Sequence, residues 1–152
     1  MYISTKTYGH EAGLSCAFRQ PNATHSHCSL IHGYALAFKF KFGCTELDDK
    51  NWAVDFGDLG ELKQWLKDNF DHKTAIDKND PDMDLFLMME ERGLIETVIM
   101  DGVGCEKFAY HAWKAADEII NKKSNGRCYC ISCEVKEHGA NSAIFLREPD
   151  DS

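Results

Sequence analysis

The segment HSHCSLIHGY, residues 25–34, holds the side chains of this chain that are best suited to chemistry. Three of the seven histidines, a cysteine and a tyrosine fall within ten positions. Imidazole and thiolate groups are ligands that zinc prefers, and they are also common groups for proton transfer and nucleophilic attack. Cys28, in a predicted loop beside these histidines, could therefore be a base or nucleophile, or an incidental surface thiol. The spacing alone leaves these interpretations open.

A second candidate is the Asp71–His72 dipeptide within FDHKT (70–74), directly after a predicted helix. A carboxylate beside an imidazole can fix its tautomer and favour its protonated form, which makes the imidazole a usable general acid. Adjacent side chains need not touch, so the dipeptide alone is a weak indication of function.

A third candidate, Glu137, ends a predicted strand in which the alternate residues from 129 to 135 are mostly apolar and share one face. A carboxylate at the end of a packed face is costly unless it meets a hydrogen-bond donor. Such a glutamate could hold a pair of N–H groups bidentately, or it could be an ordinary residue at the rim of the sheet. Both interpretations are open from this feature alone.

The same strand contains CYCISC (128–133), which resembles a metal motif. In a regular strand Cys128 and Cys130 would face one way and Cys133 the other, so the three thiols could not converge on one ion. No second Cys/His pair follows at zinc-ribbon spacing. We therefore expect core or surface thiols here.

Hydrophobic periodicity predicts the elements that must position these candidates. Residues 34–42 alternate cleanly, which is typical of a strand packed on one face, and residues 104–123 repeat apolar side chains at three and four, which predicts a long helix. The other expected elements are an interrupted strand over 2–8 and 14–18, a helix capped by Asp58 with an apolar stripe of Leu59, Leu62, Trp65 and Leu66, a short helix closed by Gly93, and a hairpin of 127–137 with 141–147. The order β-β-α-α-β-β indicates an α+β protein with an antiparallel sheet covered on one face by two helices.

Length and composition indicate a single domain, which we place at residues 1–148, with an acidic tail at 149–152. The chain has 152 residues and a formal net charge of −8. This charge disfavours nucleic acid as the main partner, because phosphate backbones bind clustered Lys and Arg. No apolar run approaches the roughly 20 residues that cross a bilayer, and the first residues do not resemble a signal peptide. We therefore expect no membrane partner and a cytoplasmic location.

Taken in order, LSCAFR, HCSLIHGY, WAVDFGDL, FDHKT and EVKE resemble the 6-pyruvoyltetrahydropterin synthase family over nearly the whole chain, with 78–100 the least similar segment. The branch that the sequence resembles most is 6-carboxytetrahydropterin synthase, an enzyme of queuosine biosynthesis. The resemblance implies the tunnelling fold, whose β-β-α-α-β-β subunits assemble through their sheets into a barrel-shaped homo-oligomer. The usual assembly is a homohexamer, a dimer of trimers.

The resemblance also implies roles for individual residues. Cys28 matches the catalytic cysteine, four residues before the H-G pair, and Asp71 with His72 matches an acid–imidazole pair that shuttles a proton. Glu137 matches the glutamate that anchors the 2-amino and N3 hydrogens of the pterin. Glu106, which opens the second long helix, is expected at the substrate as well.

A zinc cofactor is also implied, but two of its three histidine positions differ here. Phe18 and Tyr34 stand where the family has histidine, and His32 alone keeps the ligand type. A phenyl ring has no donor atom, and a neutral phenol rarely replaces imidazole on zinc. His27, with His25 as a candidate third ligand, is close enough in sequence to His32 to rebuild a site. Alternatively, the protein binds no catalytic metal.

The activity that the resemblance implies is a lyase that converts 7,8-dihydroneopterin triphosphate to 6-carboxytetrahydropterin, acetaldehyde and triphosphate. The alternatives within the family are formation of the 6-pyruvoyl product and a simple retro-aldol cleavage of the side chain. A different class of alternative is a non-catalytic member that binds a pterin or purine. Family zinc polarises the substrate side chain, so its loss would affect turnover while leaving pterin binding intact.

Overall fold

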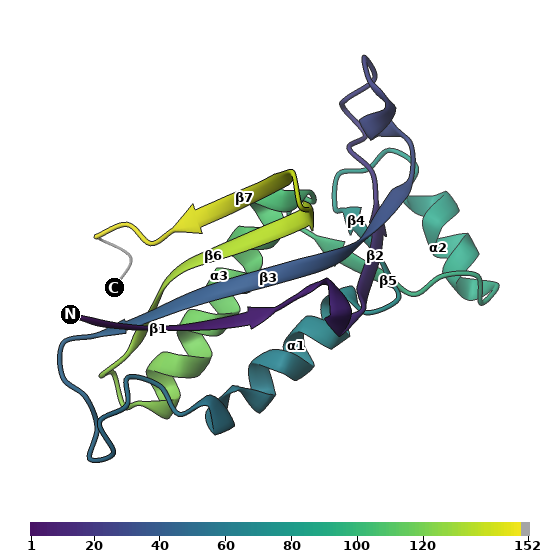
Figure 1. Cartoon of the computed structure of the whole chain (residues 1–152). Coiled ribbons are helices and arrows are strands. Elements are labelled where there is room, and N and C mark those ends of the chain that lie inside the picture. Colours follow the sequence, from purple (N-terminus) through teal and green to yellow (C-terminus); the bar gives the residue numbers. More distant parts are fainter. Residues whose placement is uncertain (150–152) are drawn as a thin grey trace.

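The computed structural model describes residues 1–149, which form one mixed β-sheet with two long helices on one face (Figure 1). The strands are β1 Tyr2–Tyr8, β2 Leu14–Phe18, β3 His32–Cys44, β4 Lys73–Asp77, β5 Thr97–Met100, β6 Tyr129–His138 and β7 Asn141–Leu146. The α-helices are α1 Gly60–Phe70, α2 Met83–Glu91 and α3 Cys105–Lys123, and short 3-10 turns occur at η1 His10–Ala12, η2 His27–Ser29 and η3 Phe56–Leu59.

Strand β3 is the centre of the sheet, because three other strands pair with it directly. β1 and β2 pair antiparallel with successive parts of one edge, and β6 pairs antiparallel along the other edge. β7 then extends the sheet beyond β6. The turn η1 separates β1 from β2, so the predicted interrupted strand and the predicted C-terminal hairpin are both confirmed.

Two short parallel strands, β4 and β5, extend the sheet beyond β2 and are not among the elements that the sequence predicts. β4 pairs with Cys16 and Ala17 of β2, and β5 pairs with β4 from Thr74 to Asp77. α2 connects them and is followed by Gly93 at a φ of 76°, which confirms the short helix that this glycine closes. The predicted antiparallel sheet is therefore correct for the larger part of the molecule, and this inserted β-α-β unit makes the whole sheet mixed.

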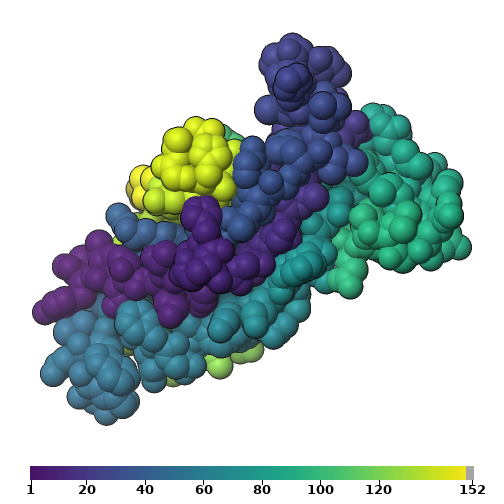
Figure 2. Space-filling view, turned by 45° about the vertical axis from the view of Figure 1, so that its right-hand side comes forward, coloured from purple at the N-terminus to yellow at the C-terminus, as the bar shows by residue number. Residues whose placement is uncertain are grey.

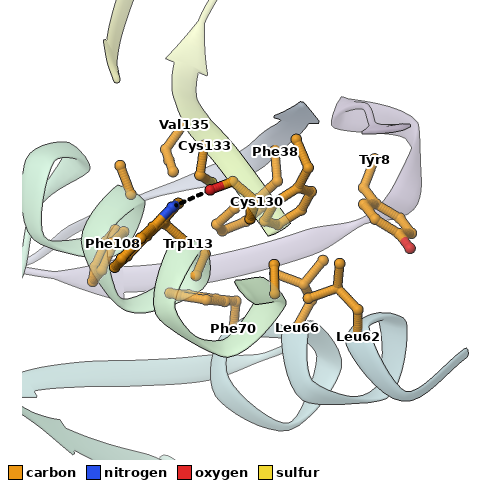
Figure 3. Close-up of a cluster of buried hydrophobic side chains, with 14 of the residues drawn as sticks. Tyr8, Phe38, Leu62, Leu66, Phe70, Phe108, Trp113, Cys130, Cys133 and Val135 are labelled. Atoms are coloured by element: carbon orange, nitrogen blue, oxygen red, sulfur yellow. Dashed lines mark hydrogen bonds between the residues drawn. The ribbon is translucent and has the colours of Figure 1, made fainter. Parts of the chain in front are cut away.

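The hydrophobic core lies between the sheet and the helices α1 and α3 (Figure 3). The even-numbered residues 36–42 of β3 are fully buried, as their alternation predicts. Phe70 at the end of α1 packs edge-on against Phe108 of α3, with ring centroids 5.2 Å apart. Trp113 of α3 donates its indole N–H to the carbonyl of Cys130 at 2.8 Å, so this buried donor is satisfied.

The predicted cap of the first helix is wrong. The chain already turns at η3, so the N–H groups that need an acceptor lie earlier than the start of α1. The side chain of Asp55, rather than Asp58, accepts a hydrogen bond from the backbone N–H of Gly57 at 2.9 Å. The predicted stripe is nevertheless on the core side, because Leu59, Leu62 and Leu66 are buried and Trp65 packs against the core.

The cysteines of β6 also depart from the prediction. The pairing of β6 with β3 skips Ile131, which forms a β-bulge and reverses the alternation of the strand. Cys128, Cys130 and Cys133 are consequently all fully buried, rather than on opposite faces. Burial raises the pKa of each of the three thiols, so they are neutral core groups.

Residues 19–31, the β2–β3 segment, project from the body of the molecule beyond the paired strands (Figure 1). In the space-filling view the same segment forms a knob that stands clear of the rest of the surface (Figure 2). His25, His27 and Cys28 are exposed on it.

No helix within residues 1–149 is both long and apolar enough to cross a membrane. The predicted acidic tail at 149–152 lies outside the described residues except for Pro149.

Candidate functional site

The candidate site begins where Glu137, near the end of β6, meets the first residue of α3. Glu137 follows the fully buried Val135 by two positions and is half-buried, and the pairing of β6 with β7 skips it, which forms a second β-bulge in this strand. Burial raises the pKa of the Cys105 thiol to about 12, with further contributions from the charge of Glu137 and a hydrogen bond to it. Cys105 is therefore a neutral thiol beside Glu137, whose carboxylate has acceptor positions for a ligand.

Tyr34 of β3 and Cys28 of the β2–β3 segment lie near Glu137 and Cys105. Burial raises the pKa of Tyr34, and the charges of Glu137, Cys28 and Cys105 raise it further. These groups therefore lie near the phenol, which stays protonated at neutral pH. Glu106, exposed in the first turn of α3, adds negative charge beside Cys105.

Phe18, His32 and Tyr34 form a triangle of rings, which includes the phenol near Glu137. Their centroids are 5.0 Å apart for Phe18 and His32, 5.5 Å for His32 and Tyr34, and 6.2 Å for Phe18 and Tyr34. Phe18 also packs edge-on against Phe108 of the core at 5.1 Å. His138, which the sequence analysis did not single out, lies on the other side of Tyr34 at 6.0 Å. The only sequence signal for His138 is that it follows Glu137 directly.

The side chains at this triangle do not fit a zinc ion. Phe18 supplies no donor atom, and the protonated phenol of Tyr34 is a poor ligand, which leaves the imidazole of His32. Within residues 1–149, no three His, Cys, Asp or Glu side chains are grouped so that they could hold a metal. The predicted rebuilt site at His32, His27 and His25 is therefore not assembled in this structure, because His25 and His27 are exposed on the projecting segment.

The Asp71–His72 pair is formed but lies elsewhere on the molecule. Nδ1 of His72 is 2.6 Å from Oδ1 of Asp71, so the adjacent side chains do touch. The backbone N–H of His72 donates to the carbonyl of Ser15, at the start of β2, whereas His32 is paired with Phe18 at its end. The side chain of His72 is 84% exposed.

Gln20 connects the β2–β3 segment to the start of α3, a role that no sequence motif indicates. Its backbone N–H donates to the carbonyl of Cys28 at 2.8 Å, and its side-chain amide donates to the carbonyl of Val103 at 2.6 Å. Gly104 follows with a φ of 105°, and a side chain there would collide with the Gln20 amide. The bonds of Gln20 therefore link the loop that carries Cys28 to the turn that leads into Cys105.

Arg19, the first residue of the β2–β3 segment, forms an ion pair that anchors it. Its guanidinium donates to Asp80 from Nε at 2.9 Å and from Nη2 at 2.6 Å, and Nη2 also donates to Asp82 at 2.7 Å. The hydrogen bonds from Arg19 hold the pKa of Asp80 below its ordinary value. Since Asp80 lies between β4 and α2, this ion pair joins the inserted β-α-β unit to the end of β2.

The fold is that of the tunnelling-fold proteins. A solved structure of an uncharacterized protein from Wolinella succinogenes matches with a TM-score of 0.78 and 17% identity, over 97% of this chain and 98% of that one. The 6-pyruvoyltetrahydropterin synthases of Plasmodium vivax and Caenorhabditis elegans match with TM-scores of 0.62 and 0.60, at 13% and 18% identity. Each of these matches covers 97% of this chain, with 99% and 98% of the respective synthase. At such identities the likeness establishes the fold alone.

The family of the chain follows from its sequence. The profile of the family described as 6-pyruvoyl tetrahydropterin synthase matches residues 9–148, so the chain belongs to this family, as its motifs predicted. Curated relatives include the 6-carboxy-5,6,7,8-tetrahydropterin synthases of Rickettsia conorii and Rickettsia bellii, each 28% identical over 57 residues. These matches cover 37% of this chain and 41% of each relative, so the chain spans less than half the length of the curated relatives it matches.

Proposed function

We propose that this protein is a pterin-directed lyase that converts 7,8-dihydroneopterin triphosphate, with uptake of water, to 6-carboxytetrahydropterin, acetaldehyde and triphosphate. The observation that carries the proposal is the half-buried Glu137 beside Cys105 at the start of α3, with Tyr34 and Cys28 near it. A carboxylate so placed suits the adjacent 2-amino and N3 hydrogens of a pterin, which it can accept as a bidentate pair. Glu106 would border the same ligand from the first turn of α3.

Cys28 would act as the base. It is the exposed cysteine of the chain, and the other six are buried, so it alone is open to a ligand. A thiolate in this position can remove a proton from the side chain of a pterin held by Glu137. The buried Cys105, with its raised pKa, is suited to hydrogen bonding rather than to proton transfer.

Asp71 and His72 would donate the second proton, and this role requires an oligomer. The pair faces solvent and bonds to Ser15, so it would reach a bound pterin from a second copy of the chain. β1 and β7, within the described residues, each pair with a strand on one side only, and such edges favour pairing with further strands. We therefore propose a homohexamer, a dimer of trimers closed through these edges.

The direct test is to incubate the purified protein with 7,8-dihydroneopterin triphosphate and to identify the products by liquid chromatography and mass spectrometry. We expect 6-carboxytetrahydropterin and acetaldehyde. A 6-pyruvoyl product would support the 6-pyruvoyltetrahydropterin synthase reaction instead. Unchanged substrate with measurable pterin binding would support a non-catalytic pterin-binding protein, which the rings of Phe18 and Tyr34 favour as the second candidate.

A further inference from the structure

The ring triangle of Phe18, His32 and Tyr34 retains the geometry of a three-ligand site but not its donor atoms. Phe18 and His32 are direct cross-strand partners, and Tyr34 follows His32 by two residues on the same face of β3. The three centroids lie within 6.2 Å of each other. Phe18 is 3% exposed and packs on Phe108, so one corner of the triangle belongs to the hydrophobic core.

His32 has a defined tautomer in this arrangement. Its Nδ1 is 2.7 Å from the carbonyl oxygen of Leu30. A carbonyl can only accept, so Nδ1 carries the hydrogen, and the neutral ring keeps a lone pair on Nε2. The second nitrogen has no hydrogen-bond partner within residues 1–149.

The hydroxyl of Tyr34 is similarly available. It makes no hydrogen bond within the part of the chain that the structure describes, although its ring contacts His32, Phe18 and His138. Tyr34 is half-buried, and Glu137 and Cys28 lie near it. No buried side-chain nitrogen or oxygen within residues 1–149 lacks a partner, so the hydroxyl of Tyr34 reaches solvent and is open to a ligand group.

We propose that Tyr34 and His32 bind a hydroxyl group of the pterin side chain directly, in place of a zinc ion, and that the ring triangle holds no zinc. This inference rests on the proposed pterin site. A hydroxyl group can accept from the O–H of Tyr34 and donate to Nε2 of His32 at the same time. The pair would orient the side chain of the ligand toward Cys28, while Glu137 holds the pterin ring.

The metal content tests the first half of the proposal without any ligand. Wild-type protein is equilibrated with zinc, dialysed at neutral pH and measured by elemental analysis, beside Tyr34→His and the double variant Phe18→His with Tyr34→His. We expect well under one zinc per wild-type chain and about one per chain in the double variant, because three imidazoles then occupy the triangle. Tyr34→His alone, with two imidazoles, covers the case in which the buried histidine prevents folding, and it should retain more zinc than wild type.

About one zinc per wild-type chain, lost in His32→Ala, would overturn the metal-free site. If the same zinc were also lost in His27→Ala, the rebuilt site on the β2–β3 segment would be established instead. These results do not depend on whether the protein binds a pterin.

The second half of the proposal is tested with two probes, neopterin, which carries a hydroxylated side chain, and pterin, which has none. Calorimetric titration of Tyr34→Phe should show about 5- to 10-fold weaker binding of neopterin than wild type and unchanged binding of pterin. A chelator should change neither affinity. Equal neopterin affinity of wild type and Tyr34→Phe would overturn the role of Tyr34, whereas absence of binding of both probes to wild type would overturn the proposed function itself.

Discussion

The two ends of the candidate site differ in how the fold holds them. Glu137 and Cys105 lie where a paired strand meets the start of a long helix, and Cys105 is buried. Cys28 lies on the projecting β2–β3 segment, and its side chain is exposed. A ligand-recognising carboxylate must be preorganised before the ligand arrives, which requires packed elements. The groups proposed for proton transfer are instead peripheral, which is consistent with a site completed when copies of the chain assemble.

The largest effect is expected from a substitution of Cys28, at the exposed end of the site. Cys28→Ala should lower turnover of 7,8-dihydroneopterin triphosphate by about 100-fold or more and leave pterin affinity within about twofold, because a base acts in the transition state rather than in recognition. Steady-state kinetics and calorimetry measure the two quantities separately. Thr24→Ala, at another exposed position of the same segment, is the matched control. Equal rates for Cys28→Ala and wild type would contradict the assignment of the base.

The ion pair of Arg19 with Asp80, at the start of the β2–β3 segment, should stabilise the fold in a pH-dependent way. Asp80→Asn breaks the ion pair with Arg19, and since the Asp80 side chain is 1% exposed we expect a loss of about 2–3 kcal/mol in the free energy of unfolding at pH 7. The folded pKa of Asp80 is lowered, so its contribution is present above the ordinary range of an aspartate and is lost as the pH falls through the folded value.

Urea unfolding at pH 7 and near pH 3 measures this effect, and the difference between wild type and Asp80→Asn should shrink in acid. Asp82→Asn is the control, because its side chain is 56% exposed and such a pair contributes at most about 1 kcal/mol. If the free energies of unfolding of wild type and Asp80→Asn differed equally at both pH values, the charge of Asp80 would be excluded as the cause of the difference.

The smallest effect is expected at the link between the two ends. Gln20→Ala removes the hydrogen bond to Val103 but keeps the backbone bond to Cys28, so the segment should loosen rather than unfold. Amide hydrogen exchange of residues 20–31 should be faster by about fivefold, as one hydrogen bond of about 1 kcal/mol is lost. Gln64→Ala, whose side chain bonds Asp68 on the surface of α1, should leave that exchange unchanged. Identical exchange in all three proteins would show that Gln20 does not couple the two ends.

The period of the strands explains what the sequence could predict. Alternation is a local property, so the buried face of β3 follows from residue parity. The bulge at Ile131 changes this parity within β6, and no residue type there signals it, so the faces of Cys128 and Cys130 were predicted wrongly relative to Cys133. Cys133 and Val135 lie beyond this bulge and share the buried face as predicted, whereas a second irregularity, in the pairing of β6 with β7, falls at Glu137.

Features that depend on contacts distant in sequence could not be predicted. β4 has five residues and β5 four, and they belong to the sheet through parallel pairing, of β4 with β2 and of β5 with β4, rather than through a pattern of their own. The proximity of Cys105 to Glu137 results from the packing of α3 on β6, which leaves no signal near either residue. The hydrogen bond of Gln20 could not be predicted for the same reason, because its partner Val103 is 83 positions away.

The most direct test of the central claim, that the packed end of the site recognises a pterin, is a calorimetric titration of Glu137→Gln with neopterin at neutral pH. The substitution keeps the shape of the side chain but replaces one acceptor by a donor, so affinity should fall by about 30-fold or more relative to wild type. Glu134→Gln on the same strand, where the carboxylate bonds Ser142, is the matched control and should bind as wild type does. Unchanged affinity in Glu137→Gln would remove Glu137 from the site and contradict the account.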